Sequence, residues 1–330
     1  TSAYNGQVKF HDSFYYLKKQ AFATVLGIVL MLFVAGMDYH IWQRLAVFGY
    51  LAAVALSVAV MLFGREINGS KRWLALGPFS FQPSEFAKVA LILFLADLVT
   101  KNVKTIGKMW TLCRIMFWIL PIVGLVGASN LSTAIIILGI GVILIFVASP
   151  KYAQFALMGI AGACFMGIFL ALESYRLERL AIWRNPEKYE KGYQTLQGLY
   201  AIGSGGVFGV GIGNSVQKLG FVPEAQNDMI FSIICEELGL AGAGIIVFLF
   251  LLLIWRFFLI ASGSRDLFGA LIATGAMAHM MIQVILNIAV VTNTIPNTGI
   301  TLPFISYGGT SVMFLLIEMG LVLSVSQVVD

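Results

Sequence analysis

The stretch MIFSIICEELGLAGAGIIVFLFLLLIWRFFLI, residues 229–260, decides the fold class. It is longer than the roughly 17 to 25 apolar residues with which one helix crosses a bilayer. We therefore expect a membrane-spanning helix here that tilts or kinks. The residues directly before it, FVPEAQND at 221–228, end a long basic, glycine-rich segment. In a chain that otherwise consists mostly of apolar helix, this polar segment is where we expect chemistry.

The composition indicates a polytopic membrane protein. Of the 330 residues, 59% are hydrophobic and only 11% are charged, and the mean hydropathy of +0.90 lies well outside the range of a soluble domain. We predict an all-α helical bundle that forms a single domain over residues 1–330, with a large loop at about 173–228. The nine expected spans are about 21–39, 44–63, 85–100, 109–128, 131–149, 152–172, 229–260, 267–292 and 306–328.

The charges favour a membrane surface over a nucleic acid as partner. Lys and Arg number 21 against 16 for Asp and Glu, a modest excess that suits anionic headgroups or phosphate. Because the positive-inside rule counts short loops near span ends, the side opposite the 173–228 loop is the better candidate for the cytoplasmic side. The three cysteines, Cys113, Cys164 and Cys235, lie in apolar runs without metal or disulfide spacing, so we expect them to be packing residues.

Asp228 is the first candidate for chemistry. It comes just before the 229–260 span, and Glu224 lies four residues earlier, so a helical turn would place both carboxylates on one face. A partly desolvated carboxylate has a raised pKa and can act as a general base. Asp is also a favoured N-cap residue, and from spacing alone the helix cap is the better supported role.

The basic residues of the loop are candidate phosphate ligands, because Arg and Lys bind phosphate oxygens. They are Arg176, Arg179, Arg184, Lys188, Lys191 and Lys218. Pairing with the acidic residues of the same loop is, without further information, the more common arrangement. The glycines at 203–213 lack the strand, the helix and the lysine of a nucleotide site, so we expect a close-packed turn near the membrane surface. Residues 68–78, which include Arg72, resemble an interfacial segment that lies flat on the membrane.

Several ionisable residues lie within or near the predicted spans. Glu85 and Lys88, three residues apart, either form a local ion pair with a snorkelling lysine or place Lys88 in an interior polar cavity. A second set either holds helices together or lines a cavity: Glu236, Glu237, His279 and Glu318. The stretch 296–311, with two prolines and three glycines, predicts a rigid irregular turn that protein or water must shield from lipid.

Four ordered groups of residues carry a resemblance to a known family. They are GSKRW at 69–73 with QPSEFAK at 82–88, GYQ at 192–194 with AIGSGG at 201–206, FVPEAQND at 221–228 with IF at 230–231 and EELG at 236–239, and PFISYGG at 303–309. Together they resemble the SEDS family of cell-wall proteins, the RodA, FtsW and SpoVE group, from the first residues to the last span. VQKL at 216–219 is closest to the FtsW and SpoVE branch.

The resemblance implies a peptidoglycan glycosyltransferase that polymerises lipid II at the outer face of the bacterial cytoplasmic membrane and releases undecaprenyl diphosphate. It also implies a class B penicillin-binding protein as the transpeptidase partner, among other divisome or elongasome proteins, and an extracellular 173–228 loop. The family's essential acidic residue falls on Asp228 and its membrane lysine on Lys88. Further candidate substrate-binding residues are Arg72, Glu224, Lys218, Arg179 and Ser306. A divalent cation, Mg or Mn, is a candidate cofactor, with no metal ligands assigned.

The chain departs from the family pattern in three places. Family members have ten spans, whereas residues 2–20 resemble the loop after the first span, so that span is expected to be missing here. SNLST at 129–133 stands where the family has a Pro-Asp-Leu-Gly-Thr-like stretch, so no role for that Asp is carried over. Ser80 stands where some relatives have an arginine. A lipid II flippase that uses the same cavity is the alternative function, and a non-catalytic scaffold for the transpeptidase is a third.

Overall fold

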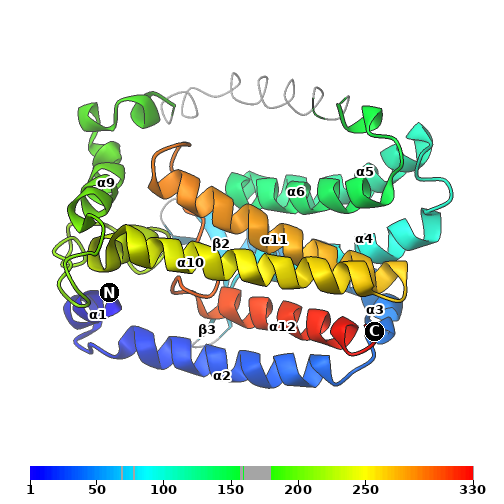
Figure 1. Cartoon of the computed structure of the whole chain (residues 1–330), viewed down its shortest axis with the longest axis horizontal. Helices are drawn as coiled ribbons and strands as arrows, with labels where there is room; N and C mark the ends of the chain where they lie inside the picture. Colours follow the sequence, from blue (N-terminus) through cyan, green and yellow to red (C-terminus); the bar gives the residue numbers. More distant parts are fainter. Residues whose placement is uncertain (68–69, 77–78, 157–158, 160–179, 330) are drawn as a thin grey trace. The chain divides into compact units, whose positions relative to one another are not determined.

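A computed structural model describes residues 1–67, 70–76, 79–156, 159 and 180–329 (Figure 1). Its elements, in chain order, are α1 (Ser2–Phe10), α2 (Tyr15–Ala35), α3 (His40–Phe63), β1 (Arg65–Ile67), β2 (Ser70–Leu76), β3 (Phe79–Phe81), α4 (Pro83–Asn102), α5 (Met109–Ser129), α6 (Leu131–Ala148), η1 (Pro186–Lys188), η2 (Glu190–Gly192), α9 (Tyr193–Gly205), α10 (Ile230–Gly263), α11 (Leu267–Val291) and α12 (Gly309–Ser326). The helical fold class is confirmed.

Within the described residues, seven helices are long and apolar enough to cross a membrane, namely α2, α3, α5, α6, α10, α11 and α12. They correspond to seven of the nine predicted spans. The eighth, 85–100, is helix α4, which carries Glu85, Lys88 and Asp97 and buries most of its residues. The ninth, 152–172, lies largely outside the described residues.

Contacts between Cα atoms divide the chain into two compact units. The first comprises Thr1–Ala21, Ala153–Leu252 and Gln283–Gly308, and the second comprises Phe22–Tyr152, Leu253–Ile282 and Gly309–Asp330. The boundaries fall inside α2, α10 and α11. The expectation of a single domain over 1–330 stays a prediction. Asp228 belongs to the first unit, and Lys88 and Arg72 belong to the second.

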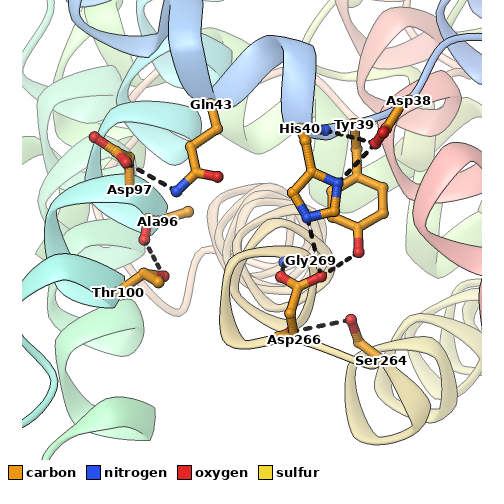
Figure 2. Close-up of polar contacts among 10 residues, drawn as sticks. All are labelled: Asp38, Tyr39, His40, Gln43, Ala96, Asp97, Thr100, Ser264, Asp266 and Gly269. Atoms are coloured by element: carbon orange, nitrogen blue, oxygen red, sulfur yellow. Dashed lines mark hydrogen bonds and ion pairs between the residues drawn. The ribbon is translucent and has the colours of Figure 1, made fainter.

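In the second unit, α4 packs against α3, α5, α6 and α12. The ring of Tyr50 on α3 stacks on Phe94 of α4 with centroids 4.3 Å apart, and its hydroxyl donates to the carbonyl of Trp118 at 2.7 Å. Gln43 on α3 donates to the buried carboxylate of Asp97 at 3.0 Å (Figure 2). Because burying an unpaired carboxylate is costly, this amide helps α4 to keep Asp97 inside the bundle.

The turn between α2 and α3 joins the start of α11 through Asp266 (Figure 2). The Tyr39 hydroxyl donates to one carboxylate oxygen of Asp266, and the other oxygen accepts the Gly269 N–H at 2.9 Å, which is N-cap geometry for α11. His40 lies between Asp266, at 3.4 Å, and Asp38, at 2.7 Å. Burial, together with the bond to Asp266, raises the pKa of Tyr39 above its ordinary value. Asp266 therefore binds both the α2–α3 turn, through Tyr39, and the first turn of α11, through Gly269.

Strands β1, β2 and β3 form a small antiparallel sheet in that order. Residues 70–76 form the central strand of this sheet, which the sequence did not predict. The expected position of residues 68–78 flat on the membrane surface stays a prediction. Extended backbone satisfies its N–H and C=O groups by pairing with neighbouring strands, as in the pair Ala75 and Ser80. The signal that could have predicted this hairpin is Asn68-Gly69 between two short strands. Thr310 donates its hydroxyl to the carbonyl of Ser80 at 2.9 Å, which ties the sheet to α12.

The expected kink in the 229–260 span falls at Gly239, with φ 66° and ψ −167°. The break frees backbone groups on both sides, and the glycine-rich turn after α9 pairs with them. The bonds are Val210 N–H to Glu236 O, Gly211 N–H to Glu237 O, Leu240 N–H to Gly206 O and Ala241 N–H to Val207 O, each 3.0 Å. A Cβ atom at Gly209 would lie 2.1 Å from the Glu237 carbonyl oxygen, so only glycine allows this approach. The predicted close packing of this turn is confirmed, and its position near the membrane surface stays a prediction.

Candidate active site

Asp228 lies in a turn directly before α10, in the first unit. Residues 223–229 form turns, so the predicted helical turn between Glu224 and Asp228 is wrong. Glu224 has φ 54°, which is left-handed and incompatible with a helix. Its carboxylate accepts a hydrogen bond from the Asn227 side chain, and its carbonyl accepts the Asn227 N–H at 2.8 Å. The two carboxylates still interact, because the charge of Glu224 acts on Asp228.

The backbone of Asp228 is held by a buried amide on α11. The Asn287 side chain, 0% exposed, donates from Nδ2 to the Asp228 carbonyl at 2.9 Å and to the Ile300 carbonyl at 2.6 Å. A Cβ atom at Gly299, where φ is +68°, would lie 3.6 Å from Oδ2 of Asp228. Gly299 therefore lies against the Asp228 carboxylate, and Asn287 connects the two segments.

Ser306, predicted as a substrate-binding residue, makes contacts that position the same loop. Its hydroxyl donates to the Asn227 carbonyl at 2.6 Å and accepts the Leu302 N–H at 2.7 Å. The next residue, Tyr307, donates its N–H to the Gln226 carbonyl at 2.8 Å. The irregular 296–311 stretch thus holds Gln226 and Asn227 by their backbone carbonyls. A direct contact between Ser306 and substrate stays a prediction.

The pKa of the Asp228 carboxyl is raised from its ordinary value of 3.8 to about 7. Burial is the largest cause, and the charge of Glu224 adds to it. Hydrogen bonds from its own N–H, from the Met229 N–H and from Gln194 oppose the shift, but Gln194 Nε2 is 3.4 and 3.5 Å from the two carboxylate oxygens. A carboxyl with a pKa near the working pH suits general-base catalysis.

The helix-cap role that spacing favoured does not describe Asp228. Helix α10 begins at Ile230, and an N-cap side chain accepts from the second or third N–H of the helix. The backbone N–H groups that act on the Asp228 carboxylate are instead those of Asp228 and Met229. The carboxylate is therefore oriented by the loop and not by the first turn of α10.

Two acidic residues near the start of α10 hold the preceding loop. Glu236 accepts hydrogen bonds from the Ser215 hydroxyl and from the Val216 N–H at 3.0 Å. Glu237 forms an ion pair with Lys218 at 2.6 Å, and both side chains are largely buried. The structure thus places Lys218 in an ion pair within the protein, and a contact with diphosphate stays a prediction. Arg179 lies outside the described residues.

Lys88 lies in a buried group of charges in the second unit. Its Nζ is 3.0 Å from Oε1 of Glu85, with the lysine side chain 2% exposed. The predicted local ion pair is confirmed, but the lysine does not snorkel to a surface. Nearby, His279 on α11 pairs with Glu318 on α12 at 2.7 Å, and His279 also interacts electrostatically with Glu85. These interactions connect α4, α11 and α12. Of the two alternatives for His279 and Glu318, the structure therefore shows that they hold helices together.

Arg72, on the central strand β2, donates from Nε to the Ser129 carbonyl at 3.0 Å. It lines a small cavity with Asn130 and Ser84. Asn130, which stands where the family has an Asp, caps helix α6 by accepting the Thr133 N–H at 3.2 Å. The amide oxygen therefore performs the capping part of what a carboxylate could do at this position.

Among the residues described, no group of three His, Cys, Asp or Glu side chains has the arrangement of a metal site. Asp228 and Glu224 provide two interacting carboxylates. Magnesium is commonly bound by one or two carboxylates together with substrate phosphates and water. The residues present fit a magnesium site of this kind, in which substrate phosphates and water complete the coordination.

The comparisons with known proteins identify the family. A family model described as "Cell cycle protein", covering FtsW, RodA and SpoVE, matches residues 1–330. The chain belongs to this family. Among similar proteins, stage V sporulation protein E of Bacillus subtilis is 39% identical over 99% of this chain and 91% of its own length. A probable peptidoglycan glycosyltransferase FtsW from Geobacter sp. (strain M18) is 34% identical over 96% of this chain and 88% of its own.

Solved structures agree with this family assignment. A chain from a peptidoglycan synthase complex that coordinates polymerization and crosslinking matches with a TM-score of 0.84 at 30% identity, over 94% of this chain and 89% of that one. The rod shape determining protein RodA of Thermus thermophilus matches with a TM-score of 0.71 at 27% identity, over 99% and 92%. With the apolar helices, these matches establish a multi-pass membrane protein of the RodA-like fold.

Proposed function

We propose that this FtsW, RodA and SpoVE family member is a peptidoglycan glycosyltransferase that polymerises lipid II, with Asp228 as the general base. The observation that carries the proposal is a carboxylate with a pKa of about 7, fixed by the buried Asn287 at the entrance to an apolar helix. Relatives named peptidoglycan glycosyltransferase favour this reaction over the flippase alternative.

The chemistry is a single displacement at the anomeric carbon of the donor. Asp228 takes the proton from the 4-hydroxyl of the acceptor GlcNAc as that oxygen forms a bond to the donor C1. The bond from C1 to the diphosphate oxygen breaks, and its electron pair leaves with undecaprenyl diphosphate. Attack opposite the leaving group inverts C1, so one base is sufficient.

Stabilisation of the leaving diphosphate requires positive charge near its oxygens. The candidates are Lys88, Arg72, Lys218 and Arg179, and they remain proposals. Glu224 is the candidate ligand for a divalent cation, Mg or Mn, whose chemistry when bound would be to neutralise phosphate oxygens. Among the four basic residues, Lys218 forms an ion pair with Glu237. It would have to leave that ion pair to bind phosphate.

We further propose that the site faces outward from the bacterial cytoplasmic membrane and that the partner is a class B penicillin-binding protein. The charge distribution of the loops supports this orientation. The match to a complex that coordinates polymerization and crosslinking supports such a partner. Other divisome or elongasome proteins would assemble around this pair.

The test uses purified protein with its partner and purified lipid II. Asp228→Asn should abolish strand synthesis, whereas Glu187→Gln, which changes an exposed glutamate on η1, should retain it. A parallel assay follows labelled lipid II across vesicles that contain the protein. Full polymerisation by Asp228→Asn would exclude the base assignment, and transport without strand synthesis by the unmodified protein would favour the flippase. Rescue of growth by an inactive Asp228→Asn protein would favour the scaffold.

A further inference from the structure

The N-terminal segment, residues 1–20, contacts the loop that carries Asp228, which we name the catalytic loop (residues 220–228). Asn5 on α1 donates from Nδ2 to Oε1 of Gln226 at 2.7 Å, across 221 positions of sequence. Gln226 is only 4% exposed, and a buried amide oxygen without a donor is destabilising. Asn5 therefore supplies a bond that the native position of Gln226 requires.

The same residue of the catalytic loop is held by its backbone as well. The Gln226 carbonyl accepts the Tyr307 N–H at 2.8 Å, and Gln226 lies only two residues before Asp228. With its side chain fixed by α1 and its carbonyl fixed by Tyr307, Gln226 has little freedom to move. Because the chain from Gln226 to Asp228 is short, a shift of Gln226 also shifts the Asp228 carboxylate.

Further contacts from the N-terminal segment reach both sides of Gln226. Tyr4 packs on Gly220, where φ is +103° and a Cβ atom would lie 3.3 Å from the ring. The ring of Tyr16 meets that of Tyr307 edge to face, with centroids 4.8 Å apart. Gln20 accepts the Gly308 N–H at 3.1 Å. The segment thus touches the catalytic loop and also the 307–308 turn that supports it.

The N-terminal segment is itself well braced, so that it can hold other residues in place. Phe10 and Tyr15 stack with centroids 3.8 Å apart, and Asp12 accepts the Phe14 N–H at 2.9 Å in the turn between α1 and α2. Gly6 packs closely on the Asp12 carbonyl, since a Cβ atom there would lie 2.7 Å from that oxygen. Helix α1 is thereby fixed against the start of α2 (Figure 1).

We propose that the N-terminal segment is a positioning element for the catalytic loop, and that Asn5 and Gln226 are the positioning residues through which it acts. The inference rests on the proposed role of Asp228. The loop has no helix or strand of its own over 223–229, and Glu224 holds a left-handed conformation. Contacts from outside the loop must therefore determine its shape, and both the Asn5 bond and the Tyr4 packing come from α1.

The test measures kcat, KM and the pH profile of lipid II polymerisation by full-chain protein with its partner. Asn5→Ala and Gln226→Ala should each lower kcat by roughly 10- to 100-fold, since misplacement by about 1 Å has effects of this size, with KM within about twofold of the unmodified protein. The midpoint of the pH profile should move below 7, because a displaced carboxylate is less buried. Gln7→Ala is the matched control: Gln7 lies on the same helix and accepts an exposed hydrogen bond from Ser13, and this variant should behave as the unmodified protein.

An exchange variant separates positioning from general damage. Asn5→Gln alone makes the pair one methylene too long and Gln226→Asn alone makes it one too short, whereas the two together restore its reach. Each single exchange should lower kcat, and the double exchange should recover most of it. These milder variants also serve if the alanine proteins fail to fold.

Three outcomes decide the inference. Recovery in the double exchange with a shifted pH midpoint in the single variants supports it. Equal kcat and equal pH midpoint in Asn5→Ala and Gln7→Ala, while Asp228→Asn is inactive, overturns the positioning role and leaves the general base in place. Full activity of Asp228→Asn in the same preparations overturns the proposed function itself.

Discussion

Replacing Asp228 with asparagine should stabilise the protein above neutral pH. The folded protein raises the pKa of this carboxyl from 3.8 to about 7, so it binds a proton more tightly than the unfolded chain does. Below pH 3.8 both states are protonated and the group has no net effect. Between 3.8 and 7 the unfolded chain releases the proton first, and stability falls by up to about 1.4 kcal/mol per pH unit. Above 7 the loss is complete, at most about 4 kcal/mol.

The assay is unfolding of detergent-solubilised protein at pH 5, 6, 7 and 8. The unmodified protein should lose stability over this range relative to Asp228→Asn, which has no carboxyl to ionise. Asp12→Asn is the control: the bond from Lys18 lowers the pKa of Asp12, so this group is ionised in both states throughout the range and the variant should keep the slope of the unmodified protein. Parallel curves for Asp228→Asn and the unmodified protein would refute the raised pKa.

Three further results are expected. The kcat of the unmodified protein should rise with pH through a midpoint near 7, because the base must be deprotonated, and a flat profile between pH 5.5 and 8.5 would contradict this. Asn287→Leu should remove the donor to the carbonyls of Asp228 and Ile300 and lower kcat by roughly tenfold or more; unchanged kinetics in folded protein would contradict the positioning role. Tyr39→Phe should destabilise the protein by about 1 to 3 kcal/mol, because Asp266 loses the hydrogen bond from the tyrosine hydroxyl. The midpoint of thermal unfolding should therefore fall while the rate of lipid II polymerisation stays the same. Loss of activity without loss of stability would contradict this structural role.

The spans were predictable because apolar length alone specifies a membrane helix. A tilt or kink of the 229–260 span followed from its excess length, although the position of the kink at Gly239 did not. The ion pair of Glu85 and Lys88 was one of two interpretations of their i, i+3 spacing. The small sheet was not predicted, because Trp and cations such as those at 71–73 are also typical of interfacial segments, although Asn68-Gly69 is a hairpin signal.

The contacts that define the site could not be read from the sequence. Asn287 lies 59 residues from Asp228 inside an apolar span. A single amide there indicates that a polar partner exists, but the sequence does not show which residue it is. The bond between Asn5 and Gln226 joins positions even farther apart. Local spacing favoured a helix cap for Asp228 and gave no sign of its raised pKa. Burial is the main cause of that shift, and burial results from tertiary packing.

The central claim is that Asp228 removes the acceptor proton. The most direct measurement is the initial rate of glycan strand synthesis from purified lipid II at pH 8, where the unmodified carboxyl is ionised, by folded Asp228→Asn protein with its partner. The expected rate is lower than that of the unmodified protein by roughly 100- to 10,000-fold, the usual contribution of a general base, while Glu187→Gln, which changes an exposed glutamate on η1, keeps the full rate. A rate for Asp228→Asn within a few-fold of the unmodified protein would contradict the claim.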